Sequence, residues 1–133
     1  MPLARVPLTG SQDVAMANVS LQRGYTLTAP AGPPTTTFIR GELNVQGLPS
    51  LLYWVRLITP VAGVIWTPMF SITNTTVAGV TTPDWLPFNN GIILVPGNVT
   101  TFSIRAAVGI MGMRFEIPAG NTITIATAMT AGG

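Results

Sequence analysis

Three reactive residue types are missing from this 133-residue chain. It contains no cysteine and no histidine, and all six of its basic residues are arginines, so lysine is absent as well. Without cysteine the chain can form neither disulfides nor thiolate nucleophiles. Without histidine or lysine, a serine or threonine nucleophile lacks the general base that would activate it. We therefore expect no nucleophilic catalysis and no enzyme activity.

Acidic residues are almost as scarce. The four carboxylates are Asp13, Glu42, Asp84 and Glu116, too few to supply a transition-metal site in a chain without cysteine or histidine. Asp84 precedes Trp85, an arrangement similar to an acid beside a sugar-binding ring, but Asp84 also follows Pro83, where aspartate is a common turn residue. The sequence thus predicts no catalytic residue, no metal and no cofactor.

The basic residues are scattered singly along the chain. No two arginines lie within eight positions of each other, and the formal net charge is only +2. Proteins that bind nucleic acid usually gather arginine and lysine on one face, often between aromatic residues. This pattern is missing, so we expect no nucleic-acid partner.

Charge as a whole is too sparse for an ordinary soluble monomer. Charged residues make up 8% of the chain and apolar residues 47%, against about 25% charged residues in typical globular domains. The longest apolar run, Leu51 to Ile58, is interrupted by Arg56 and falls well short of the roughly 18 residues of a spanning helix. Met1 to Ala17 also lacks the apolar core of a secretory signal. We therefore expect no membrane partner, and a surface that other copies of the chain or other partners cover.

Apolar and polar residues alternate with period two along most of the chain. This pattern is typical of half-buried strands, and apolar residues never recur at helical spacing over more than two turns. The sequence predicts an all-β fold of about eight strands, arranged as a two-sheet antiparallel β-sandwich. A jelly-roll-like topology is favoured over an immunoglobulin-like one. Residues 17–133 form the single sandwich domain, preceded by an extended N-terminal arm, 1–16.

The segment from Gly91 to Met129 has the strongest strand pattern. Its four apolar runs are cut at 96–98, 109–112 and 118–121, and this spacing predicts a β-meander. In the last run Ile123 and Ile125 share one face, which we expect to be buried. We expect 109–112 to be a hairpin turn, with Met111 and Met113 filling a gap in the core or in an interface.

Two earlier segments carry specific expectations about their faces. In 36–45, alternation places Thr37, Ile39, Leu43 and Val45 on one face, and Phe38, Arg40, Glu42 and Asn44 on the other. An ion pair between Arg40 and Glu42 is then expected. In 51–58 both faces are apolar, which predicts a strand covered by the second sheet on one side and by something else on the other.

Six residues are candidate contacts to a partner. The arm carries Leu3, Arg5, Val6 and Leu8, which suit either a frayed terminus or an arm that lies on a neighbouring subunit. The long loop 79–90 carries Trp85 and Phe88, which suit either a small aromatic platform for sugars or packing within an assembly.

Taken together, these features resemble the decoration (cement) proteins of tailed-phage heads. The resemblance lies in the arm MPLARVPLTGSQ, the turn in EIPAGNTITI, the strand pattern rich in Thr, Val and Ile, and the lack of Cys, His and Lys. It covers the whole chain and concerns its build, with no family-specific motif matched. It implies a small β-rich virion protein that forms trimers, binds the major capsid protein and stabilises the capsid surface.

Two other functions remain open at this point. A minor capsid or spike-base protein could have the same build. A carbohydrate-binding or adhesin module would use Trp85 and Phe88, and we would expect it to be monomeric. The sparse charge instead predicts a homo-oligomer, with a trimer as the simplest ring in which unlike surfaces of a sandwich pair.

Overall fold

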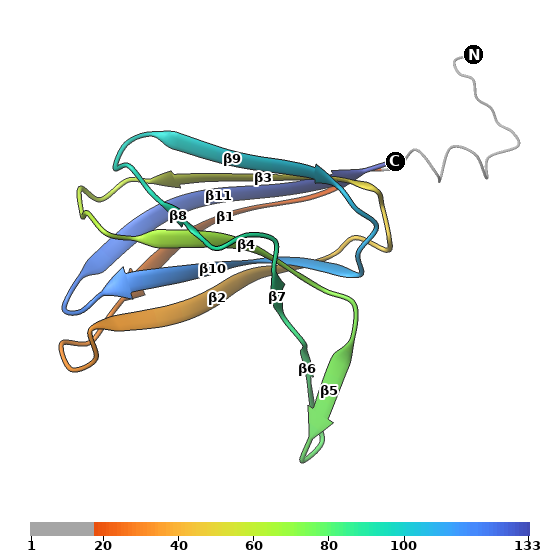
Figure 1. Ribbon diagram of the computed structural model, residues 1–133, viewed down its shortest axis with the longest axis horizontal. Helices are drawn as coiled ribbons and strands as arrows, with labels where there is room; N and C mark the ends of the chain where they lie inside the picture. Colours follow the sequence, from red (N-terminus) through yellow and green to blue (C-terminus); the bar gives the residue numbers. More distant parts are fainter. Residues whose placement is uncertain (1–17) are drawn as a thin grey trace, which may run out of the picture.

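The alternating segments build two antiparallel sheets that pack face to face, as the sequence predicts (Figure 1). The computed structural model describes residues 18–133. The arm 1–16, with Leu3, Arg5, Val6 and Leu8, lies outside the described residues.

The first sheet, sheet A, contains the first and last strands of the described chain. Its strand order is β1-β11-β3-β9, and every neighbouring pair is antiparallel. The strands are β1 (Val19–Thr28), β11 (Thr122–Gly132), β3 (Ser50–Leu57) and β9 (Val99–Arg105).

The second sheet, sheet B, has the order β2-β10-β4-β7, and β8 also pairs with β4. Its strands are β2 (Thr35–Asn44), β10 (Ile110–Pro118), β4 (Ile65–Ser71), β7 (Leu86–Pro87) and β8 (Ile92–Ile93). Because β7 and β8 both pair with β4, they act as one interrupted edge strand.

The strand pairs are nested, which makes the topology a jelly roll. The first strand pairs with the last (β1 with β11), β2 pairs with β10, β3 pairs with β9, and β4 pairs with β7 and β8. This is the arrangement of one long hairpin rolled so that its successive pairs fall in alternate sheets, and it matches the double-sheet architecture expected from the sequence.

The β-meander predicted for 91–129 is wrong. The strands β9, β10 and β11 are consecutive in sequence, but β10 lies in sheet B and the other two lie in sheet A. Strand and turn patterns are local, whereas the partner of each strand is set by contacts with distant segments. The predicted turn at 109–112 is wrong for the same reason, because β10 begins at Ile110 and runs through this segment.

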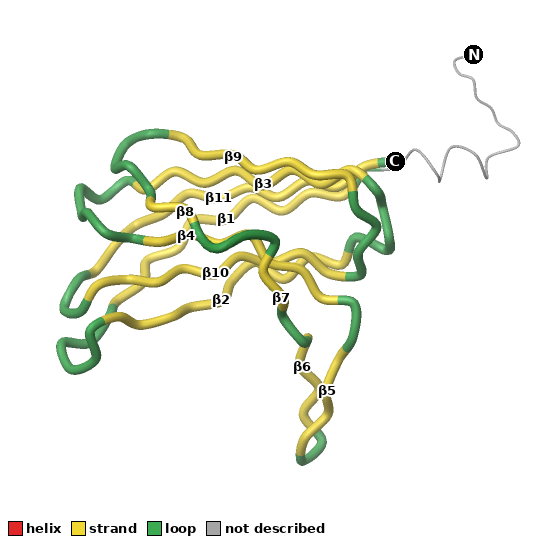
Figure 2. The backbone as a smooth tube through the Cα atoms, in the orientation of Figure 1, coloured by secondary structure: helices red, strands yellow, loops and turns green. Residues whose placement is uncertain are grey.

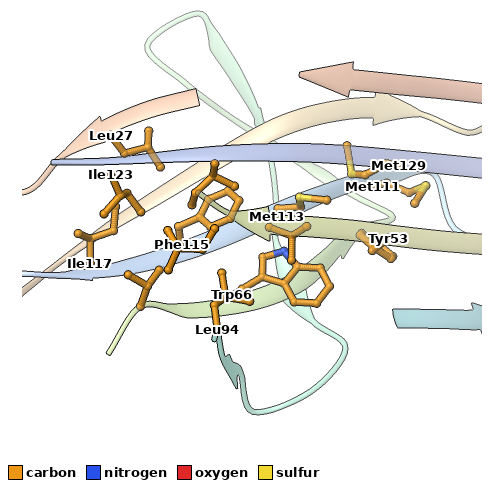
Figure 3. Packing of buried hydrophobic residues seen from close by; sticks show 14 of the residues in the cluster. Leu27, Tyr53, Trp66, Leu94, Met111, Met113, Phe115, Ile117, Ile123 and Met129 are labelled. Atoms are coloured by element: carbon orange, nitrogen blue, oxygen red, sulfur yellow. The ribbon is translucent and has the colours of Figure 1, made fainter. Parts of the chain in front are cut away.

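The core lies between the two sheets and is filled by their inward side chains (Figure 3). Ile123 and Ile125 are fully buried, as predicted, and so are Met111 and Met113. The largest buried side chains are Trp66, Tyr53 and Phe115. The Tyr53 hydroxyl donates a hydrogen bond of 2.7 Å to the Met69 carbonyl, so this core phenol has a partner.

A β-bulge reverses the alternation in β2. The register between β10 and β2 shifts between Met111 and Met113, which pair with Leu43 and Arg40, and Gly41 between the latter two has φ +77°. One extra residue in β2 puts both Phe38 and Leu43 against the core and leaves Ile39 outside.

The predicted face assignment for 36–45 therefore holds only after Gly41. Among the described residues, Arg40 does not pair with Glu42; its guanidinium donates to the Ile39 carbonyl at 2.9 Å and lies 5.3 Å from the centre of the Phe38 ring.

A separate two-stranded ribbon, β5 (Asn74–Val77) with β6 (Val80–Pro83), projects from the sheet B side of the sandwich, away from sheet A (Figure 2). Its turn is Ala78-Gly79, and both residues have positive φ, as a tight two-residue hairpin turn requires.

Candidate functional site

The outward side of sheet A carries an open hollow of ≈ 640 Å³. The strands β1, β11 and β3 contribute its lining: Gln22, Arg23, Gly24, Leu52, Trp54, Ala126, Thr127 and Ala128. Side chains alternate along a strand, so Gln22, Gly24, Leu52, Trp54, Ala126 and Ala128 point outward. Arg23 and Thr127 lie between them, in register with the buried Val55, and border the hollow from the other face of the sheet. The hollow is thus built on a rigid, well-packed sheet.

Small residues in register form the floor of the hollow. Across the sheet, Gln22 pairs with Ala128, which pairs with Trp54. One step along, Gly24 pairs with Ala126. Because glycine and alanine have small side chains, the outer surface of the sheet is recessed at Gly24, Ala126 and Ala128. The larger side chains of Leu52 and Trp54 line the side of this recess, and Leu52 is 43% exposed.

This arrangement explains the strand that is apolar on both faces. Leu51, Tyr53, Val55 and Leu57 are buried against sheet B, which confirms the first half of that prediction. The opposite face of the strand, with Leu52 and Trp54, lies on the open hollow, and within the described chain no second layer covers it.

The two sides of the sandwich differ in charge. The sheet A strands carry Arg23, Arg56 and Arg105, all exposed, and no carboxylate side chain. On the other side, sheet B and the segment that follows the ribbon carry two arginines, Arg40 and Arg114, together with all three described carboxylates, Glu42, Asp84 and Glu116. Arg114 and Glu116 form an ion pair of 3.7 Å. Sheet A is thus positive, and the side that carries the ribbon is weakly negative.

Asp84 fastens the base of the ribbon. Its carboxylate accepts hydrogen bonds from the Thr73 and Thr75 hydroxyls, at 2.9 and 2.6 Å, and its backbone N–H donates to the Thr73 carbonyl at 2.9 Å. Asp84 directly follows β6 and lies in no turn, so its role in these local contacts differs from the turn residue that the sequence favoured. The carboxylate orients the ribbon where it leaves the sandwich.

Trp85 and Phe88 occupy different environments and form no common platform. A Cβ on Gly112, in β10, would lie 2.5 Å from the Trp85 ring, so the indole lies directly on that glycine. Trp85 also lines a smaller hollow of ≈ 310 Å³ with Ile39, Arg40, Gly41 and Glu42. Phe88 instead packs in an aromatic cluster, with ring centres 4.4 Å from Phe70 and 5.6 Å from Phe102.

The sequence indicated Leu52 and Trp54, as part of the two-sided apolar strand 51–58, but it did not predict the hollow or its other residues. The available signals were the two-sided apolar strand 51–58 and the small residues Ala126 and Ala128 at alternate positions of the last strand. Local patterns did not indicate that these two segments are neighbours, because β3 and β11 lie far apart in the chain and pair through long-range contacts.

Two tyrosines of the described chain have raised pKa values. Burial raises the pKa of the Tyr53 hydroxyl well above its ordinary value. It also raises the pKa of Tyr25, although Arg23 and Arg40 act in the opposite direction.

Within residues 18–133 no three histidine, cysteine or acidic side chains gather as metal ligands would. In the same range no helix is long and apolar enough to span a membrane.

No protein-family model and no curated protein matches the chain. Two solved structures are distantly similar to it in fold, each with a TM-score of 0.43. One comes from work on Bacillus endospore appendages, described as a novel family of disulfide-linked pili; it is 17% identical, over 88% of this chain and 89% of that chain. The other is the structure of the infectious bursal disease virus Gx strain; it is 16% identical, over 90% of this chain and 34% of that chain.

Proposed function

We propose that this chain is a non-enzymatic structural subunit that associates with copies of itself on a virus capsid, as a decoration (cement) protein. Its partners are then other copies of the chain, as a trimer in the simplest case, and the major capsid protein. Its location is the outer surface of the virion.

The uncovered outer face of sheet A carries this proposal. It combines a large apolar hollow, exposed Leu52 and half-buried Trp54 with a surface that has few charges to keep it dispersed in water. Large apolar patches on small proteins are typical of association surfaces. A subunit that binds only the assembled shell stabilises that shell by mass action, with no chemical step.

A carbohydrate-binding module is the second candidate, and Trp54 favours it. Its indole lines an open hollow to which Gln22 also contributes, across Ala128, and an aromatic ring in a site with polar groups is a common setting for sugar stacking. The aromatic residue at issue is then Trp54, since Phe88 is engaged in the aromatic cluster.

Mass spectrometry of gradient-purified tailed-phage heads, from a culture that expresses the chain, tests the capsid role. We expect the chain to sediment with the heads in a constant ratio to the major capsid protein, and the free chain without heads to stay at the top of the gradient. Absence of the chain from washed heads would overturn the decoration role. Retention of the chain on a glycan array through Trp54 would then favour the carbohydrate-binding function.

A further inference from the structure

We propose that copies of this chain associate head to tail, with the β5–β6 ribbon of one copy docked in the sheet A hollow of the next. The inference rests on the self-association proposed above and identifies the two surfaces that meet. It commits to one occupant of the hollow, the ribbon of a second copy.

The ribbon presents apolar side chains on one face and has no charged residue. Val77 pairs with Val80, and Thr75 pairs with Thr82, so these four side chains share a face. Val77 is 68% and Val80 is 62% exposed. An isolated two-stranded hairpin is marginally stable in water, and one with exposed valines at its tip is better suited to a covered site than to solvent.

The hollow complements the ribbon in both shape and charge. Its small floor residues and the side chains of Leu52 and Trp54 offer an apolar seat for two valines. Arg56 pairs with Ala126 and so shares the outward face with the hollow. Asp84, at the base of the ribbon, would approach Arg56, and no described carboxylate side chain on sheet A would repel it.

The placement of the two surfaces makes the contact intermolecular. The ribbon projects from the side of the sandwich opposite to sheet A (Figure 1), so it cannot reach the hollow of its own copy. A docked pair still has a free hollow on one copy and a free ribbon on the other. Such a contact between unlike surfaces produces a ring if its rotation closes, as in a trimer, and a filament if it does not.

Charge also separates the ribbon from the other apolar segment that could occupy the hollow. The apolar part of the N-terminal arm carries Arg5 among Leu3, Val6 and Leu8, and the one carboxylate of the arm, Asp13, follows later in the sequence. In the hollow, Arg5 would meet Arg56 with no described carboxylate side chain nearby on sheet A, and like charges repel. The ribbon brings no cation.

Two single substitutions in the full chain test the contact, one on each surface. Val77→Asp places a charge on the ribbon tip, and Ala128→Arg fills the floor of the hollow. We expect each variant to be monomeric by light scattering at concentrations at which the unmodified chain is oligomeric. Ile93→Asp, at a residue that is 67% exposed on β8, and Thr37→Arg, at an exposed position of β2, are the matched controls and should stay oligomeric. Circular dichroism checks that every variant is folded.

Mixing the two interface variants tests whether the contact is head to tail. The Val77→Asp copy keeps its hollow and the Ala128→Arg copy keeps its ribbon, so the mixture can form one intact contact per pair. We expect particles of twice the 14.0 kDa chain mass and no larger ones. A symmetric contact would not be restored by mixing, and failure to form the pair would overturn the inference.

Engineered cysteines locate the contact directly, because the chain has none of its own. Copies with Val77→Cys, mixed with copies with Ala128→Cys, should form disulfide-linked heterodimers under mild oxidation. A mixture of Val77→Cys and Thr37→Cys copies should not. If the unmodified chain is oligomeric and neither substitution weakens it, the docking is wrong while the proposed self-association stands. If the unmodified chain is a monomer at every concentration, both are wrong.

Discussion

At the residue scale, the core of this protein is held by apolar packing, with one buried phenol that has a specific partner. Ile123, Ile125 and Phe115 are fully buried between the sheets. Tyr53 lies among them and donates to the Met69 carbonyl. The stability of the sandwich should therefore respond strongly to changes at these positions and weakly to changes at exposed apolar ones.

Ile125→Ala tests the buried face of β11. Removing three carbon atoms from a fully buried side chain leaves a cavity, and we expect the free energy of unfolding to fall by about 2–5 kcal/mol. Ile93→Ala, on an exposed side chain, should change it by about 0.5 kcal/mol or less. Denaturant unfolding measures both; an equal effect of the two substitutions would contradict the described core.

Tyr53 should make the protein less stable at alkaline pH. Below about pH 10 the hydroxyl is protonated in the folded and in the unfolded chain. At higher pH the unfolded chain releases this proton while burial raises the pKa of Tyr53 in the folded chain, so the free energy of unfolding falls as pH rises.

Tyr53→Phe removes the ionisable hydroxyl, so the free energy of unfolding should fall less steeply with pH in the alkaline range. It should also cost about 1 kcal/mol at neutral pH, through the lost hydrogen bond. Thermal unfolding between pH 8 and pH 11 measures both effects. An unchanged alkaline slope in the Tyr53→Phe variant would contradict this account.

At the element scale, the β2 bulge and the ribbon are the two departures from regular sheet. The bulge at Gly41 turns Phe38 and Leu43 toward the core. The ribbon is attached through Asp84 and its two threonine partners. Neither feature follows from alternation, because one depends on a single left-handed residue and the other on side-chain contacts at its base.

Gly41→Ala tests the bulge, and Gly47→Ala is its matched control. Both glycines have similar positive φ, +77° and +75°, but a Cβ at Gly41 would lie 2.9 Å from the Met129 methyl carbon, whereas one at Gly47 would meet nothing within 4 Å. Both substitutions should destabilise by about 1 kcal/mol or more through the left-handed backbone. The free energy of unfolding should fall further in the Gly41 variant, because the Met129 side chain has to move. An equal fall in the two variants, measured by denaturant unfolding, would contradict the close packing of Gly41 against Met129.

Asp84→Ala tests the attachment of the ribbon. It removes the acceptor of two threonine hydroxyls, so we expect faster hydrogen exchange at the amides of β5 and β6. The core strands, to which Asp84 makes no hydrogen bond within the described chain, should keep their protection. Unchanged exchange in the ribbon would mean that its own pairing is sufficient to hold it.

At the scale of the whole molecule, the sequence predicted the all-β sandwich, the jelly-roll topology and the burial of Ile123 and Ile125. Period-two alternation, a direct consequence of strand geometry, predicted the strands and the buried face of β11, whereas the sandwich and its jelly-roll topology were favoured on the number of strands and the spacing of turns. The meander at 91–129 was wrong, and the hollow around Trp54 and Ala128 was missed, because both depend on which distant strands become neighbours. Sparse charge predicted a surface that partners cover, and the paired strands show an uncovered apolar candidate for it on sheet A.

The central claim is that this surface is an association surface, and light scattering on the full chain at micromolar concentration tests it most directly. We predict a mass of at least two chains of 14.0 kDa each, and of three chains if the ring is a trimer. In the Val77→Asp and Ala128→Arg variants the mass should fall to that of a single chain. A monodisperse species of 14.0 kDa for the unmodified chain at every concentration would contradict it.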